Sequence, residues 1–339
     1  MSAMPPGEPT SNASAHGLDV PGQELLGDSL KPHDGTVYHY TDATGLQGML
    51  GAGHVWASQA SSLNDRSEAI DGWRRLHEML ISEDADDLQS FAVSRLQDAR
   101  EASARVFVVS ASTEPNDVNQ WRLYAADGWG YSLAIPPGRL TVQSAPRTPG
   151  APRLEELYRT HWQPVLRPWI KVIYTDEQLR RVVRELIANV SSQEKSIRDA
   201  DDGAQDNGYM DLGQRIEDAL ATIAYLVKPA GFRGENEVRT VVTLRAATLL
   251  AKGPARTVGH FPPFFRSGRN GIVGYFKLGW DSASEGSGDR IPWQEIICGP
   301  RHRHGDEVGS TVHEETIRML IASSGLDPIE IRTSDISLR

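Results

Sequence analysis

The alternation of apolar and polar positions predicts two strands and a helix near the start of the chain. Residues 37–41 read VYHYT and residues 54–58 read HVWAS, and both are rich in the branched and aromatic residues that strands favour. Between them, Leu46, Met49 and Leu50 recur at helical spacing, and two glycines follow. The sequence therefore predicts a strand, a helix and a second strand in direct succession.

Later apolar runs predict a sheet with many more strands. These runs are continuous or rich in β-branched residues, as buried strands are. They occupy residues 105–112, 130–136, 169–175, 236–246, 271–280, 291–300 and 329–336. Amphipathic periodicity predicts helices in the segments between them, at about 66–80, 84–102, 118–127, 176–199, 212–227 and 309–325.

Strands and helices mix without regular βαβ alternation, which is typical of an α+β fold with a largely antiparallel or split sheet. Residues 1–34 are rich in Pro, Gly, Ser and Asp, so we expect a flexible N-terminal tail. No linker divides residues 35–339, which are therefore predicted to form a single domain. The long helices at about 176–228 form a helical insertion in that domain.

Composition narrows the classes of function. The 339 residues include 39% hydrophobic side chains, enough for a substantial core. A single cysteine, Cys298, excludes an internal disulfide framework and indicates a reducing, cytoplasmic location. We expect no membrane helix and no secretion signal. The net charge of −10 argues against a broad nucleic-acid-binding surface, although it allows a local basic pocket for a phosphorylated small molecule.

The first candidate for chemistry is the histidine within VYHYT. Side chains alternate along a strand, so His39 and Thr41 share one face while Tyr38 and Tyr40 share the other. A ring nitrogen and a hydroxyl at the end of a strand could hold a ribose. A core histidine bonded to a backbone carbonyl is the simpler structural explanation.

The second candidate is a pair of acids in FRGENEVRTVVTL, at residues 232–244. Glu235 and Glu237 are two positions apart at the predicted start of a strand, so they point the same way, as does Arg239. They could form a carboxylate pair that acts on a sugar. They could equally form an ion-pair ladder with Arg233 and Arg239, and the spacing alone does not separate these alternatives.

Other motifs are less specific. Trp121 and Tyr124 share a helix face and could stack on a flat heterocycle, or could simply pack in the core. The hydroxyls at residues 110–113 could support a catalytic carboxylate, bond a ribose or cap a loop. His302 and His304 have no further ligands nearby in the sequence, so no metal site is predicted.

Several segments in this order resemble the bacterial domain of unknown function 2971 family, over about residues 37–333. The resemblance rests on LND after the second predicted strand and on the pattern F-x-x-E-x-E-x-R. The segments that carry it are residues 37–68, 106–135, 227–241 and 296–300.

The opening strand also resembles that of the ADP-ribosyltransferase superfamily, which has Y-H-x-T or H-G-T there and a late E-x-E. The resemblance implies a split, mostly antiparallel sheet with flanking helices and implies NAD as substrate. It implies that His39 holds a ribose hydroxyl and that Trp121 or Tyr124 flanks the nicotinamide. It also implies that Glu237, or less favourably Glu235, binds the 2′-hydroxyl of the nicotinamide ribose. The bulky Tyr40 departs from the pattern, which often has glycine at that position.

The implied activity is transfer of ADP-ribose from NAD to an acceptor with release of nicotinamide, in a toxin or phage-defence effector. The acceptor could be protein, nucleic acid, a small molecule or water, and with water the chain would be an NAD glycohydrolase. A non-catalytic nucleotide- or protein-binding module is the alternative, and its mark would be acids tied up in ion pairs. The remaining candidate NAD-binding residues are Tyr38, Thr41, Asn64 and Ser110.

Overall fold

The computed structural model describes most of the chain from residue 20 onwards. The described residues are 20, 22–62, 66–83, 93–94, 96–97, 105–143, 161–199, 202–247, 263–268, 271–281, 290–302 and 307–338. Among them, no helix combines the length and the apolarity needed to cross a membrane. The predicted helix at 84–102 falls mostly outside these residues, as does the predicted tail up to residue 19.

Twelve strands of the described chain form one sheet, in the order β12-β11-β4-β1-β3-β2-β10-β5, with β8 paired to β3, β6 and β7 paired to β8, and β9 paired to β10. All pairs are antiparallel except the parallel pair of β11 and β12. The strands are β1 (Val37–Thr41), β2 (Val55–Gln59), β3 (Val106–Ser112), β4 (Tyr131–Ile135), β5 (Leu140–Val142), β6 (His161–Leu166), β7 (Ile170–Lys171), β8 (Glu237–Ala247), β9 (Phe264–Gly268), β10 (Gly271–Trp280), β11 (Glu295–Cys298) and β12 (Glu330–Thr333).

The sheet is split beside its central strand β3. One edge of β3 pairs with β8 along its whole length. The other edge pairs with β1 only at Ser112 and with β2 only at Val108 and Phe107. Strands β1 and β2 therefore share that edge and leave the middle of β3, around Ser110, without a paired strand on this side.

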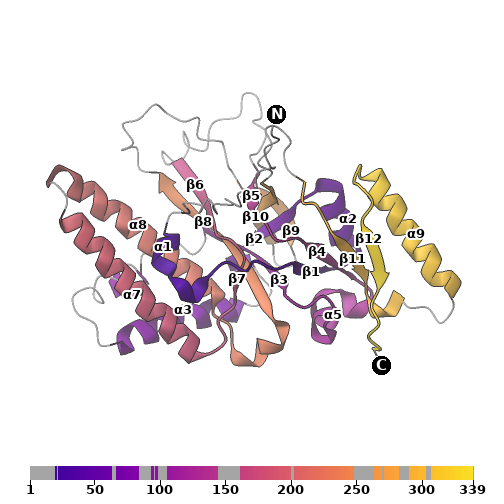
Figure 1. Cartoon of the computed structure of the whole chain (residues 1–339), viewed down its shortest axis with the longest axis horizontal. Coiled ribbons are helices and arrows are strands. Elements are labelled where there is room, and N and C mark those ends of the chain that lie inside the picture. Colours follow the sequence, from indigo (N-terminus) through magenta and orange to yellow (C-terminus); the bar gives the residue numbers. More distant parts are fainter. Residues whose placement is uncertain are drawn as a thin grey trace, which may run out of the picture.

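The helices gather at opposite ends of the sheet, with α1, α3, α7 and α8 at one end and α9 at the other (Figure 1). The longer helices are α2 (Ala43–Ala52), α3 (Arg66–Ser82), α5 (Val118–Tyr124), α7 (Asp176–Arg198), α8 (Asp202–Leu226) and α9 (Glu307–Ser323). Shorter turns are α1 (Gln23–Leu26), η1 (Asp28–Leu30), η2 (Ala60–Ser62), η4 (Ala126–Gly128), η5 (Ala230–Glu235) and η6 (Pro300–His302).

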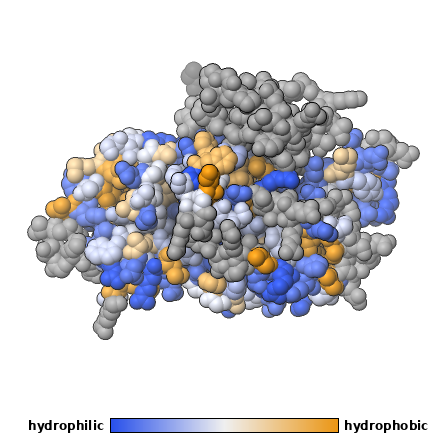
Figure 2. Space-filling model, turned by 180° about the vertical axis from the view of Figure 1, so that it is seen from behind, coloured by the Kyte–Doolittle hydropathy of each residue, from blue (hydrophilic) through white to orange (hydrophobic). Residues whose placement is uncertain are grey.

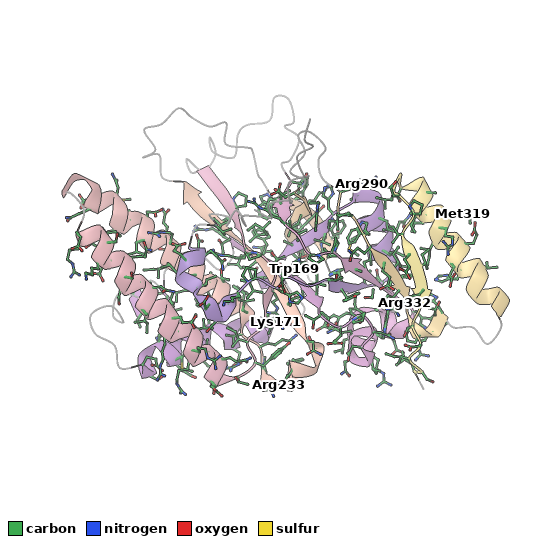
Figure 3. All side chains as sticks on the ribbon, viewed as in Figure 1. Trp169, Lys171, Arg233, Arg290, Met319 and Arg332 are labelled. Carbon is green, nitrogen blue, oxygen red and sulfur yellow. The ribbon has the colours of Figure 1, made fainter. Side chains whose placement is uncertain are left out.

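Strand alternation divides the interior into two large cores. Val108 and Val241 point to the face that is covered by α1, α3, α7 and α8. Val109 and Val242 point to the opposite face, where residues of α2 and α9 pack. Trp169 belongs to this second core and lies near the middle of the molecule (Figure 3). On the rear face, hydrophobic residues form separate small groups among hydrophilic ones (Figure 2).

The predicted α+β class with a mostly antiparallel sheet is confirmed. Helix α7 begins at the predicted residue because Thr175 and Gln178 form a capping box there. Two predictions need correction. Helix α8 starts at Asp202, ten residues before the predicted 212. The expected flexible tail does not extend to residue 34, since α1 and η1 pack Leu25, Leu26 and Leu30 into the first core.

The contact between α3 and α8 gives a test of this packing. A Cβ added at Gly72 of α3 would lie 2.1 Å from the carbonyl oxygen of Ala224 in α8. We expect Gly72→Ala to lower the free energy of unfolding by about 1–3 kcal/mol, because the helices must separate. The matched control is Gly51→Ala in α2, where a Cβ meets nothing within 4 Å and stability should stay equal or rise. Equal denaturant midpoints for Gly72→Ala and the wild type would contradict this packing.

Candidate active site

The two predicted acids lie at the junction of η5 and β8. Glu235 is the last residue of η5, and Glu237 is the first residue of β8. Asn236 between them has a φ of 46°, a left-handed conformation that asparagine tolerates better than most residues. The two acids are therefore not successive same-face positions of one strand, as the sequence predicted, but the turn still brings both carboxylates to one cation.

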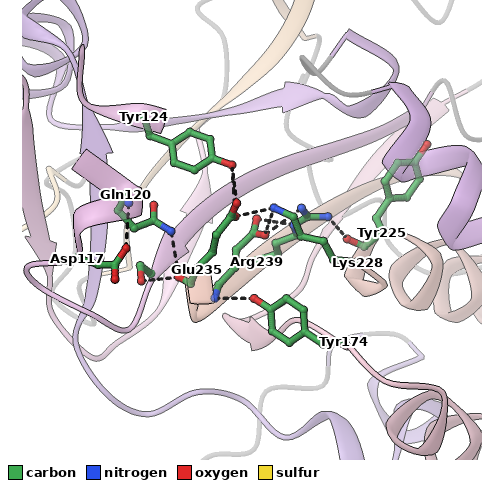
Figure 4. A network of polar contacts seen from close by, with 10 residues as sticks. Asp117, Gln120, Tyr124, Tyr174, Tyr225, Lys228, Glu235 and Arg239 are labelled. Carbon is green, nitrogen blue, oxygen red and sulfur yellow. Dashed lines mark hydrogen bonds and ion pairs between the residues drawn. The ribbon is translucent and has the colours of Figure 1, made fainter. Parts of the chain in front are cut away.

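That cation is Lys228, which follows α8. Its Nζ lies 2.6 Å from Oε2 of Glu235 and 3.0 Å from Oε2 of Glu237 (Figure 4). The Nε of Arg239 lies 2.7 Å from Oε1 of Glu237, and its Nη1 donates to the carbonyl of Tyr225 at 2.7 Å. The four charged side chains are each at most 5% exposed. Lys228, Glu235, Glu237 and Arg239 thus form a buried ion cluster of two acids and two bases.

Two tyrosines border the ion cluster. The hydroxyl of Tyr124 in α5 donates to the carboxylate of Glu235 at 3.2 Å. Tyr124 is nevertheless 44% exposed to solvent. The hydroxyl of Tyr174 accepts the backbone N–H of Glu237 at 3.0 Å. Tyr124 therefore lies between Glu235 and solvent, whereas Tyr174 fixes the start of β8 from within.

Hydroxyls of β3 support both acids. Ser112 donates from Oγ to the backbone carbonyl of Glu235 at 2.8 Å, and the side-chain amide of Gln120 donates to the same oxygen at 3.0 Å. The side chain of Ser110 hydrogen-bonds to Glu237. Of the predicted explanations for these hydroxyls, Ser110 shows support of a carboxylate, and Ser112 also accepts the backbone N–H of Glu114, as a loop cap does.

The two acids ionise differently because they face different numbers of cations. Burial alone would raise the pKa of Glu237, but the charges of Arg239 and Lys228 outweigh burial and lower this pKa to about 2. Burial also raises the pKa of Glu235, and Lys228 offsets that effect only in part, so this pKa stays above its ordinary value. The nearby acids more than offset the effect of burial on Lys228, and its pKa is raised.

His39 and Glu237 both contact Ser110 of β3, although the register puts them on opposite faces of the sheet. In the register, His39 pairs with Leu133, a residue of the second core, so its side chain lies on the same face of the sheet as that core. Glu237 pairs with Ser112 on the opposite face. The His39 ring instead lies at the split, where Nδ1 is 2.9 Å from the carbonyl oxygen of Ser110, and burial lowers its pKa. The simpler explanation, a histidine bonded to a backbone carbonyl, describes this geometry.

The other predicted residues are spread over several surroundings. Trp121 is fully buried, its Nε1 donates to Asn116, and its ring packs edge-on against Tyr40, so it cannot stack on a nicotinamide ring. Tyr38 pairs with Ser112 and therefore shares the face of Glu237, whereas strand alternation puts Thr41 on the face of His39. Asn64 and His304 lie outside the described residues.

Lys228 was not among the site residues predicted from the sequence. Arg233, which was predicted to pair with the acids, is exposed and lies at the edge of the molecule (Figure 3). Lys228 forms the ion pair with Glu235 instead. Its signal was a lone charge between the apolar end of α8 and Pro229. A lysine in such a context requires an acidic partner, because an unpaired charge is not buried. Within the described part of the chain, no three His, Cys, Asp or Glu side chains are placed to hold a metal ion.

The low pKa of Glu237 predicts a pH-dependent contribution to stability. A folded-state pKa of about 2 against the ordinary 4.5 contributes about 3 kcal/mol, fully present above pH 4.5 and lost as the pH falls toward 2. We therefore expect the stability deficit of Glu237→Gln relative to the wild type to be largest at pH 7 and to shrink at pH 3.5, measured by urea unfolding. Glu177→Gln, at an exposed position, should show no such trend. A deficit for Glu237→Gln that does not change with pH would contradict the ion cluster.

Residues 120–240 match the family model described as Protein of unknown function (DUF2971). No curated protein and no solved structure matches the chain. The matched segment extends from α5 to the first residues of β8, so it contains Tyr124 and all four members of the ion cluster. The resemblance to the domain of unknown function 2971 family is therefore confirmed over the segment that builds the candidate site.

Proposed function

We propose that this chain cleaves the bond between nicotinamide and ribose in NAD and transfers ADP-ribose to an acceptor. One observation carries the proposal: Glu237, an ionised carboxylate, is held rigidly at the start of β8 by Ser110 and two cations, beside a second carboxylate. The order of these groups along the chain matches what the resemblance to ADP-ribosyltransferases implies. His39 lies on the other face of the sheet and is linked to Glu237 only through Ser110, so we assign it no catalytic step.

The chemistry needs a fixed negative charge. When the C1′–N bond breaks, its electron pair moves onto the nicotinamide ring and cancels the positive charge there. The ribose is left as an oxocarbenium-like cation, as in glycoside cleavage. A carboxylate that is ionised at all physiological pH values and oriented in advance can stabilise that cation. Glu237 satisfies this requirement because its pKa is about 2.

Glu235 suits a different step. The acceptor, or water, loses a proton as its oxygen or nitrogen bonds to C1′. A base with a pKa above the usual carboxylate range accepts that proton more readily. The pKa of Glu235 is raised by burial, and its carboxylate accepts a hydrogen bond from Tyr124, which is 44% exposed. We assign Glu235 as the base and Tyr124 as the aromatic side chain beside the nicotinamide.

A non-catalytic binding module is the second candidate, and the ion pairs favour it. Both carboxylates are at most 5% exposed and are paired with cations, which is the mark expected of a module. Catalysis requires the Tyr124 side chain to move away from Glu235 when substrate enters. The acceptor stays open between protein, nucleic acid, a small molecule and water. We propose that the chain acts in the cytoplasm, as a toxin or a phage-defence effector.

Release of nicotinamide tests the enzymatic proposal. Purified chain is incubated with NAD labelled in the adenine half, and free nicotinamide and labelled products are measured. We expect Glu237→Gln to lower the rate at least about 100-fold, because the charge that stabilises the cation is removed. The matched control Glu177→Gln, an exposed residue of α7, should match the wild type.

Two outcomes contradict the proposal in different ways. A wild-type chain that releases no nicotinamide supports the binding module. A Glu237→Gln variant that is as fast as the wild type refutes the assigned site. Because Glu237→Gln also weakens a buried ion cluster, Glu235→Gln is assayed beside it at a temperature where circular dichroism shows both variants folded. We expect Glu235→Gln to lose the acid limb of the pH profile while Glu237→Gln loses activity at all pH values.

A further inference from the structure

A second cluster of side chains lies on strands β2, β10 and β9. Tyr275 pairs with Ser58 on one side and with Phe264 on the other, and Lys277 pairs with Trp56. Paired residues point to the same face of a sheet. Three aromatic rings therefore form a row across three strands, with ring centroids 4.9 Å apart for Trp56 and Tyr275 and 5.7 Å apart for Phe264 and Tyr275.

Two cations are interleaved with these rings. The guanidinium of Arg266 lies 5.8 Å from the Trp56 ring, and Nζ of Lys277 lies 4.4 Å from the Phe264 ring. Arg266 donates from Nη2 to Oγ of Ser58 at 3.0 Å, and its buried Nε has no hydrogen-bond partner. In the part of the chain that the structure describes, neither cation pairs with a carboxylate. We call Trp56, Phe264, Arg266, Tyr275 and Lys277 the aromatic–cationic surface.

The chemistry of this surface fits a flat anion. Trp56 is 38% exposed, so its ring presents area to solvent beside two positive charges. An aromatic ring stacks on a purine base, and a guanidinium with unused N–H groups binds phosphate oxygens in a forked geometry. A chain with a net charge of −10 repels anions in general, so two cations at one place, neither of them paired with an acid among the described residues, favour a local site for phosphate.

The surface lies on the same face of the sheet as Glu237. Ser58 pairs with Val108 of β3, and Val108 pairs with Val241 of β8, four residues beyond Glu237 and on the same face. Trp56, two residues before Ser58, falls at the level of Ser110. Neighbouring strands are about 4.8 Å apart, so β2 lies roughly 10 Å from β8 across β3. Val108 and Val241 are covered by the first core, but Ser110, at the level of Trp56, is part-exposed, and an extended dinucleotide can cross β3 there.

We propose that the aromatic–cationic surface binds the ADP half of NAD, with Trp56 stacked on the adenine and with Arg266 and Lys277 on the pyrophosphate. This inference rests on the proposed function, because it assigns the two ends of one substrate to two parts of one sheet face. It puts the nicotinamide ribose at Glu237 and the adenine on the far side of β3.

The test measures binding and turnover separately. Binding of ADP to the full chain is measured by isothermal titration calorimetry, and KM for NAD is measured by nicotinamide release. We expect Trp56→Ala and Arg266→Ala each to weaken ADP binding and to raise KM for NAD by about tenfold or more, with little change in kcat. Nicotinamide mononucleotide, which lacks the adenine, should bind Trp56→Ala as tightly as it binds the wild type.

Two matched controls lie close by. Phe265, on the same strand β9, points to the opposite face and is 68% exposed, so Phe265→Ala should behave as the wild type. Lys171 is an exposed lysine on β7, so Lys171→Ala controls for loss of a positive charge. Circular dichroism and the denaturant midpoint confirm that each variant is folded before binding is compared.

The outcomes separate this inference from the proposed function. No binding of ADP by the wild type, or equal binding by Trp56→Ala and Phe265→Ala, overturns the inference whatever the activity. Weaker ADP binding with an unchanged KM for NAD shows a site for a free nucleotide and also overturns it. If ADP binding depends on Trp56 and Arg266 but the wild type releases no nicotinamide, the nucleotide site stands and the enzymatic proposal falls.

Discussion

The burial of Lys228 is the constraint on which the candidate site depends. An ammonium group that is 2% exposed must be paired, since the free energy of an isolated buried charge is prohibitive. Glu235 and Glu237 supply the pairing, and η5 together with the left-handed Asn236 brings them into reach. The end of α8 is thereby fixed to the start of β8, so one interaction joins the helical end of the molecule to its central strands.

The same pairing makes the two acids chemically unequal. Glu237 lies between Arg239 and Lys228 and stays ionised, whereas Glu235 shares a single ammonium and keeps a raised pKa. Two acids of different strength on one turn suit a reaction in which one group stabilises positive charge and the other accepts a proton. The difference in pKa between the two acids arises because β8 and α8 bring different cations to each of them. The local spacing of the two acids in E-x-E would not produce this difference.

The sequence indicated much of the fold and about half of the site. Apolar periodicity found β1, β2, β3 and α7, and the like charges of E-x-E with Arg239 pointed to the right strand. The position of His39 could not be foreseen, because it depends on where β1 leaves β3, which is a matter of sheet topology. For Trp121 the sequence left open stacking on a heterocycle or packing in the core, and the bond to Asn116 and the contact with Tyr40 hold it in the core. Trp56 drew no attention because its cationic neighbours come from strands that are distant in the sequence.

Energetics argue that the ion cluster serves more than the fold. Well-packed apolar side chains of similar volume often stabilise a protein as well as a buried ion pair or better, since the desolvation of the charges offsets much of their attraction. The first core, which continues from Val241 of the same strand, is built from such apolar side chains. Four charges at the start of β8 are therefore not what packing alone would select. Their position beside the exposed Tyr124, on the sheet face that also carries Trp56 and Arg266, is better explained by a charged, extended ligand lying across β3.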